Sequence, residues 1–100
     1  MKTDKGNNQP ESMALALKSI AHPDRLRMLM LLGCSSELSV SEIQKKTNLT
    51  QSMTSQHLLA MKSRGILSSR KKENRVYYSI LNKNVLKVIS CMKKCASHHA

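Results

Sequence analysis

Apolar residues follow a helical rhythm along most of the chain, interrupted by one stretch of strict alternation. In the N-terminal part, Met13, Leu17 and Ile20 recur at intervals of four and three positions. This spacing places the three side chains on one face of a helix. We therefore expect a first, amphipathic helix over residues 11–20.

Two further helices are apolar enough to form an interior or an interface. A nearly continuous apolar run, Met28–Leu32, follows Pro23 and precedes Gly33. Proline suits the first turn of a helix and glycine is common just past its end, so the second helix should run between these two residues. A broad stripe of Val, Leu and Ile follows Asn82, a good N-cap, and predicts a last helix that ends near Ser97.

Two short polar helices are expected in the middle of the chain, separated by a tight turn. Ser39 or Ser41 caps the first of them, over residues 41–47. Thr50 caps the second, over residues 51–64. A short helix, a turn of about three residues and a longer polar helix are typical of helix-turn-helix proteins.

Extended structure is expected in two places. Residues 37–40 form a short extended segment before the helix pair. Residues 66–70 and the alternating segment 75–80 are joined by a charged turn over residues 71–74, which predicts a hairpin. The fold class that follows is mainly α (α+β): a winged helix-turn-helix of about five helices with a two-stranded hairpin wing.

The composition narrows the partner to a polyanion. The 100 residues hold 17 Lys+Arg against 6 Asp+Glu, which gives a net charge of +11, and a chain of this length builds a single core. We assign residues 1–10 to a flexible polar tail and residues 11–97 to one domain that binds DNA and dimerises. With two Tyr, no Phe and no Trp, the chain lacks the aromatic platforms that single strands and RNA require. Double-stranded DNA is therefore the expected partner.

Other classes of function find less support. No apolar stretch approaches the ~20 residues that span a bilayer, and no apolar signal segment opens the chain. We therefore expect a cytoplasmic protein without membrane contact. A P-loop, a glycine-rich dinucleotide loop and an HExxH motif are all missing, so we expect no enzyme. A non-specific architectural DNA-binding protein is the alternative to a sequence-specific one.

Polar and basic side chains in two places are candidates for DNA contact. Short polar side chains at the start of the second polar helix can enter a major groove, where Gln pairs with adenine edges and Ser reaches bases or phosphates. Basic side chains near the hairpin turn suit phosphates or the minor groove. An ordinary solvated surface is the alternative for both places. The candidate contacts are Thr50, Gln51, Ser52, Ser55, Gln56, His57, Arg70, Lys72 and Arg75.

Four stretches resemble the ArsR/SmtB-type repressors, a metal-responsive winged-helix family. Leu17–Leu29 looks like that family's LxxLAHPxRLxIL opening, and Glu37–Ile43 resembles the start of its third helix. Thr50–Leu58 resembles its SQSxxSQHL recognition helix, and Gly65–Leu67 with Arg75–Tyr78 resembles its wing. The resemblance implies a homodimer held by its first and last helices. It also implies a repressor that binds an imperfect operator palindrome and is released by an effector.

The same resemblance leaves the effector open. Arsenic-sensing members carry a CVC pattern where this chain has Ser39 and Ser41, and hydroxyls do not replace thiolates for a soft metal. Zinc-sensing members take four ligands from the last helix, two of them near its start. Neutral amides replace those two here, because the four aligned positions are Asn82, Asn84, Cys95 and His98.

Three cysteines leave two kinds of effector chemistry. One branch of the family senses sulfane sulfur or oxidants through one cysteine in the second helix and one in the last, which implies Cys34 with Cys91 or Cys95, in a shifted register. Alternatively, Cys91, Cys95 and His98 lie on one helical face and could hold a transition metal such as zinc. We expect release by thiol oxidation or reactive sulfur, with a metal-responsive repressor as the alternative and no certain cofactor.

Overall fold

The computed structural model describes residues 10–99, without the side chains of residues 12 and 92–99. The described chain forms five helices and three strands, in the order α1 (Pro10–Ile20), α2 (Pro23–Cys34), β1 (Leu38–Ser39), α3 (Val40–Thr47), α4 (Gln51–Ser63), β2 (Leu67–Lys72), β3 (Arg75–Ile80) and α5 (Lys83–His99). The fold class is mainly α with a small antiparallel sheet, as the sequence predicts. The predicted tail lies outside the described residues except for Pro10, which begins α1.

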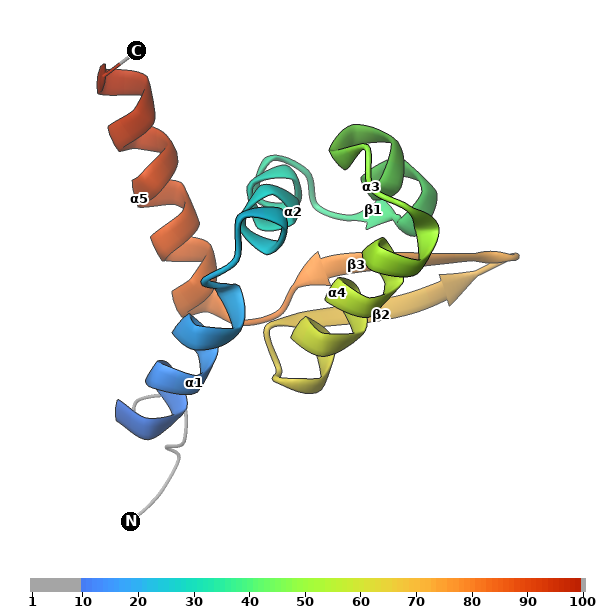
Figure 1. The fold of residues 1–100 in the computed structure, drawn as a ribbon, viewed down its shortest axis with the longest axis horizontal. Helices are drawn as coiled ribbons and strands as arrows, with labels where there is room; N and C mark the ends of the chain where they lie inside the picture. The colour runs from blue at the N-terminus through green and yellow to red at the C-terminus, as the bar shows by residue number, and fades with distance from the viewer. Residues whose placement is uncertain (1–9, 100) are drawn as a thin grey trace.

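The two terminal helices and the tip of the hairpin occupy opposite sides of the molecule. α1 and α5 lie along one side, and the β2–β3 hairpin projects from the other (Figure 1). α2 lies between α5 and the rest, and it contacts both α5 and β3. α3 and α4 pack on each other beside the sheet. The two helices predicted to dimerise thus lie away from the hairpin tip, and α1 also contacts α4.

α2 begins as predicted, but the prediction that it ends at Gly33 is wrong. His22 is its N-cap, because the His22 side chain accepts a hydrogen bond from the backbone N–H of Asp24. The helix continues through Gly33 to Cys34. A Cβ built on Gly33 would lie 3.2 Å from Cγ2 of Ile89, so the missing side chain lets α5 pack closely on α2.

The sheet has three strands where the hairpin pattern predicts two. β2 and β3 pair as far as Lys72 opposite Arg75, so the turn consists of residues 73–74 alone and is shorter than predicted. β1 pairs with the other edge of β3, with Leu38 opposite Tyr78. A two-residue strand carries no periodicity of its own, so its partner 40 positions away could not be found from the pattern of the sequence.

The core lies between α2, α3, α4, the sheet and the first half of α5. Each large apolar side chain buried there stabilises the fold by ~1.5–3 kcal/mol relative to an exposed one. The prediction that Thr54, Leu58 and Met61 turn toward the core is confirmed, and this anchors α4 by one face. The largest fully buried side chains are Met28, Leu29, Ile43, Leu58, Met61, Ile66, Leu67 and Ile89.

Candidate DNA interface

Local hydrogen bonds set the ends of α3 and α4. Ser39, and not Ser41, is the N-cap of α3: its Oγ accepts from the backbone N–H of Glu42, and the Glu42 carboxylate accepts from the backbone N–H of Ser39 at 2.9 Å. Hydrogen bonds to the Glu42 carboxylate, first from the Ser39 backbone N–H and then from the Ser39 side chain, lower the pKa of Glu42. α3 stops at Asn48, whose φ of 59° is left-handed, and Thr50 caps α4 through its Oγ1. The helix-turn-helix geometry is therefore encoded by residues close together in the chain.

α4 has a polar outer face opposite its buried one. The exposed set at its start is predominantly short and uncharged, which suits approach to base edges. Because Ser52 and Gln56 are four positions apart, they lie above one another on this face. The candidate contacts Thr50, Gln51, Ser52 and Gln56 are exposed, and Ser55 is half-buried. Five of the six candidates at this end of α4 are thus on its surface, and their contacts with DNA stay a prediction.

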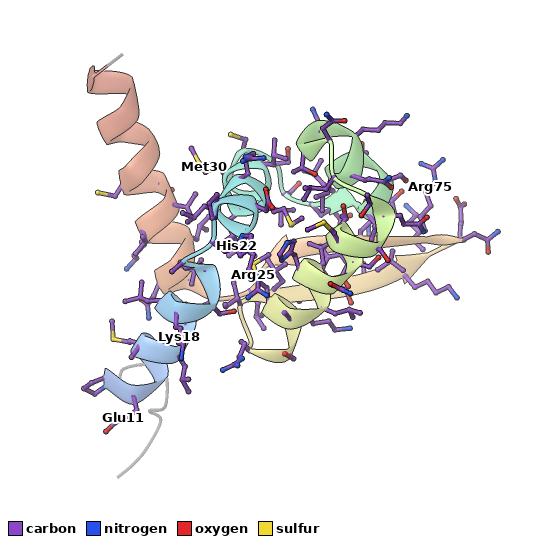
Figure 2. The ribbon with its side chains drawn as sticks, in the orientation of Figure 1. Glu11, Lys18, His22, Arg25, Met30 and Arg75 are labelled. Atoms are coloured by element: carbon purple, nitrogen blue, oxygen red, sulfur yellow. The ribbon has the colours of Figure 1, made fainter. Side chains whose placement is uncertain are left out.

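A groove brings part of this face together with the hairpin. Gln51 and Ser55 line one wall of it, and Arg75 lies at the other wall with its neighbours Asn74 and Val76. The remaining wall is the start of α3, with Ser39, Val40, Ser41 and Gln44. Figure 2 shows Arg75 at the winged end of the molecule, near α3 and α4. Three of the predicted contacts, far apart in the sequence, therefore share one concave surface.

Three of the hairpin's four cations share one face. Residues opposite each other in an antiparallel pair point to the same side, and side chains alternate along each strand. Lys72 lies opposite Arg75 and Arg70 lies opposite Tyr77, so the three cations share one face. Lys72 and Arg75 are exposed at the tip, as is Lys71 on the other face. Lys71 was not among the predicted contacts, although its charge was visible in the sequence.

Arg70 is committed to an ion pair. Its Nε donates to Oε2 of Glu37 at 2.9 Å and its second guanidinium nitrogen donates to Oε1 of the same carboxylate. The Arg70 guanidinium also lies 5.5 Å from the centre of the Tyr77 ring. The hydrogen bonds from Arg70 lower the pKa of Glu37, and the same pairing raises the pKa of Arg70. Among the three predicted hairpin contacts, Lys72 and Arg75 form no ion pair at contact distance within the described residues.

His57 lies inside the protein, so the prediction that it contacts DNA is wrong. Its side chain is 8% exposed, and its Nδ1 accepts a hydrogen bond of 3.1 Å from Nε of Arg25. Burial and the nearby Arg25 charge lower the pKa of His57. The His57 ring lies 4.7 Å from the ring of His22, on the first turn of α2. His57 therefore connects α4 to α2.

The cluster around His57 has the proximity of a metal site without its chemistry. His22, Asp24 and His57 each offer one ligand atom, and these atoms lie within 4.8 Å of one another. Both imidazoles accept a hydrogen bond at Nδ1, from the Asp24 backbone N–H and from Arg25. A neutral imidazole that accepts at Nδ1 carries its proton on Nε2 and has no second lone pair for a metal. The Arg25 charge opposes a cation further, so the cluster is a junction of hydrogen bonds.

The structure describes some of the residues that were predicted to respond to an effector. Cys34 and Cys91 are both exposed. The close approach of Gly33 to Ile89 places the end of α2 against α5. Gly33 directly precedes Cys34 in α2, and Ile89 precedes Cys91 by two positions in α5. The side chains of Cys95 and His98 lie outside the described residues, as do their proposed roles in a metal site.

α1 and α5 carry apolar surface that the protomer does not cover. Met13 and Leu17 of α1 are 46% and 53% exposed, and Val88 of α5 is 40% exposed. These three line one hollow between the two helices, with Ile20 and Val85 buried at its floor. A contiguous apolar surface of this kind marks an interaction site. Among residues 10–99, no helix combines the length and the apolar character needed to cross a membrane.

Known proteins are similar to this chain in sequence and in fold. A model of the bacterial regulatory proteins of the arsR family matches residues 22–69. The HTH-type transcriptional regulator YgaV of Escherichia coli (strain K12) is 39% identical over 83 residues, which make up 83% of this chain and 84% of that protein. The chain belongs to the arsR family. The family resemblance seen in the four sequence stretches is thereby confirmed.

Solved structures of similar proteins show the same fold. The transcriptional repressor PagR of Bacillus anthracis is 35% identical, and its crystal structure matches with a TM-score of 0.76 over 82% of this chain and 93% of that one. The homodimeric winged helix-turn-helix DNA-binding domain of Mb0332 from Mycobacterium bovis is 28% identical, with a TM-score of 0.79 over 98% of this chain and 90% of that one. This arsR-family protein is thus a winged helix-turn-helix, DNA-binding transcription regulator and not an enzyme.

Proposed function

We propose that the protein is a cytoplasmic, homodimeric repressor that binds a palindromic operator and leaves it when an effector acts on the dimer. The observation that carries this proposal is the groove shared by α3, the start of α4 and the hairpin tip. It combines uncharged side chains that suit base edges with a cation that suits phosphate. Sequence-specific binding needs both kinds of contact on one surface.

In this proposal the predicted contacts divide by role. Gln51, Ser52, Ser55 and Gln56 read bases in the major groove, and Thr50 contacts the backbone beside them. Lys72 and Arg75 contact phosphates or the minor groove on either side. Support comes from their exposure and from the groove that brings Gln51, Ser55 and Arg75 together.

The proposed DNA-binding form of the protein is a homodimer held together through α1 and α5. The uncovered apolar hollow between these helices is one argument for it, and the homodimeric state of Mb0332 is another. A two-fold dimer would bury the same surface on both protomers. It would also set the two recognition helices one DNA turn apart, about 34 Å. PagR, a relative that is itself a repressor, supports repression as the outcome.

The effector proposal is oxidation or sulfuration of thiols, with Cys34 and Cys91 as one candidate pair. A bridge between them would require Cα atoms within about 7 Å. The close packing of Gly33 on Ile89 supports only the approach of the two helices, because Cys91 comes two positions after Ile89 and so lies on the other side of α5. Such a bridge would pin α2 to α5 at the proposed dimer seam, and Cys95 is the other candidate partner. A metal-responsive repressor using Cys91, Cys95 and His98 is the second candidate function.

Binding measurements on matched DNA test the repressor. Fluorescence anisotropy compares a palindrome from the protein's own promoter region with scrambled DNA of equal length at physiological salt. We expect a preference of ~10³ or more, and a ratio near one would identify an architectural DNA-binding protein instead. Gln51→Ala and Ser52→Ala should each cost ~1–3 kcal/mol on the palindrome alone. Ser63→Ala, on the far end of the same helix, is the control and should bind as the parent does.

A second experiment tests the effector. The parent, Cys34→Ser, and the double variant Cys91→Ser/Cys95→Ser are bound to the palindrome and treated with an oxidant, a persulfide or zinc. We expect oxidant or persulfide to release the parent and to leave both variants bound. Release by zinc alone would favour the metal-responsive alternative. If the double variant dissociates as the parent does, the thiols have no part in release.

A further inference from the structure

One guanidinium joins three helices of this protein. Arg25 lies in the first turn of α2, and its terminal nitrogen donates to the backbone carbonyl of Ser19 at 2.8 Å and to the Ser19 hydroxyl at 3.2 Å. Its Nε donates to Nδ1 of His57 at 3.1 Å. Ser19 belongs to the last turn of α1 and His57 to the middle of α4. Figure 2 shows Arg25 and His22 near the centre of the view, between α1 and α4, and both side chains are half-buried.

Each acceptor of Arg25 would otherwise lack a strong donor. The Ser19 carbonyl is one of the last carbonyls of α1, which have no partner within their own helix. A cation at this position also interacts favourably with the negative end of the helix dipole. Ser19 itself is buried, so water does not replace Arg25 there easily. The polar link between α1 and α2 therefore depends on the side chain of Arg25.

The His57 side of the junction fixes one orientation of the imidazole. Arginine only donates hydrogen bonds, so the ring nitrogen that faces Nε must accept. The other nitrogen, Nε2, is buried and has no hydrogen-bond partner. The hydrogen bond from Arg25 to Nδ1 is therefore the hydrogen bond that the His57 ring makes, while Nε2 makes none. The orientation of His57, and with it the placement of α4, depends on that hydrogen bond.

We propose that Arg25 is a positioning residue that holds the recognition helix α4 at a set angle to the dimerisation helix α1. Arg25 contacts no DNA in this scheme, and the inference rests on the proposed specific binding by a dimer. Two recognition helices must match two half-sites at once, so a small rotation of α4 against α1 changes the fit at both. Phosphate contacts alone tolerate such a change, because they carry no base information. Loss of Arg25 should therefore reduce specificity more than general affinity.

Lysine should not replace Arg25. The guanidinium donates to Ser19 and to His57 from two different nitrogens held in one plane, whereas an ammonium has a single nitrogen on a flexible stem. Arg25→Lys keeps the charge and removes the simultaneous contact. Arg27→Lys is the matched control: Arg27 lies two positions beyond Arg25 on the same helix and pairs only with Asp24 among the described residues, with a side chain 56% exposed.

The experiment measures specific and non-specific DNA binding for parent, Arg25→Lys and Arg27→Lys, with the dimer mass and melting temperature of each. We expect Arg25→Lys to lower the specific-to-non-specific ratio by about fivefold or more, the lower range of one lost base contact. Non-specific affinity should stay within about twofold, the measured mass should remain that of the dimer, and Arg27→Lys should match the parent. An unchanged ratio in Arg25→Lys would overturn the proposal.

Two variants of His57 separate positioning from stability. Asn places its amide oxygen where Nδ1 stands, so His57→Asn keeps an acceptor for Arg25, whereas His57→Leu removes it. We expect His57→Asn to retain the ratio of the parent and His57→Leu to lose it, and this result also decides the matter if Arg25→Lys does not fold. Equal losses of specific and non-specific binding that follow the melting temperature would show a structural role alone. A parent ratio near one would instead refute the proposed function.

Discussion

Ser55 and His57 stand two positions apart on α4 and face different surroundings. Ser55 lines the groove that also contains Arg75, whereas His57 is buried. The spacing explains the difference, because His57 comes three residues after Thr54 and four before Met61, both of which are buried. That interval was the signal in the sequence that could have placed His57 inside. A polar residue in a recognition helix is therefore a candidate contact only after its helical face is determined.

Acid should destabilise the protein through His57. Burial and the charges of Arg25 and His22 lower the pKa of His57 from its usual 6.5, and Asp24 opposes them. The unfolded chain then binds the proton before the folded one does, so stability is complete above 6.5 and falls as the pH drops from there toward the folded pKa. Melting temperatures between about pH 5 and 8 measure this for the parent and His57→Asn. Curves of the same shape for both proteins would contradict the prediction.

Lys72 and Arg70 should differ in their effect on DNA binding although both are hairpin cations. Lys72→Ala should weaken binding to all sequences and reduce the salt slope by about one. Arg70→Ala should change the slope less, because Glu37 already neutralises that charge. Glu37→Gln, which releases Arg70, should raise affinity for all DNA at low salt. Equal slopes for Lys72→Ala and Arg70→Ala would show that the ion pair opens on DNA.

The hairpin depends on a two-residue turn with an unfavourable residue in it. Glu73 has a φ of 56°, a left-handed conformation that glycine adopts without cost and that side chains with a Cβ resist. The turn nevertheless places Lys72 opposite Arg75 and so brings both cations to the tip. The wing thus accepts local strain at the point where it presents its charge.

Glu73→Gly should stabilise the protein by ~0.5–1 kcal/mol, because it relieves the left-handed strain. Glu73→Gln is the control, since it removes the charge and keeps the strain. Chemical denaturation should show a gain for Gly and none for Gln, whereas both variants should bind DNA more tightly through the lost negative charge. A gain in stability from Gln as large as that from Gly would assign the effect to charge.

The apolar hollow and the cationic hairpin tip lie at different ends of the protomer. α1 and α5 carry the uncovered apolar hollow on one side, and the hairpin carries its cations on the other (Figure 1). Two such protomers joined through the hollow would leave both wings and both α4 helices accessible. This separation allows one small domain to dimerise and bind DNA at the same time.

Leu17→Glu should convert the dimer to a monomer and abolish specific binding, because it places a charge in the hollow between α1 and α5. Leu15→Glu is the matched control, since Leu15 is 51% exposed against 53% for Leu17 and does not line the hollow. Analytical ultracentrifugation should find the Leu15→Glu variant dimeric. Two dimeric variants would place the interface elsewhere on the molecule.

The element types and most of their ends followed from the sequence, because neighbouring residues determine them. The capping pair Ser39 and Glu42, the Thr50 cap and the Asn82 cap each satisfy backbone groups a few positions away. The amphipathic stripe of α4 likewise predicts which of its faces is buried. Such local signals were enough for the helix-turn-helix, for the wing and for the family.

Other features depend on contacts between distant parts of the chain, and the tertiary structure alone decided them. β1 exists because Leu38 meets Tyr78, and Gly33 serves the packing of α5 where a helix stop was expected. Arg70 reaches Glu37 across 33 positions, and Arg25 reaches His57 across 32. Each of these features is a contact between two residues that are far apart in the sequence. The pattern of residues along the chain gives the type of each residue, but folding decides which distant residue it contacts.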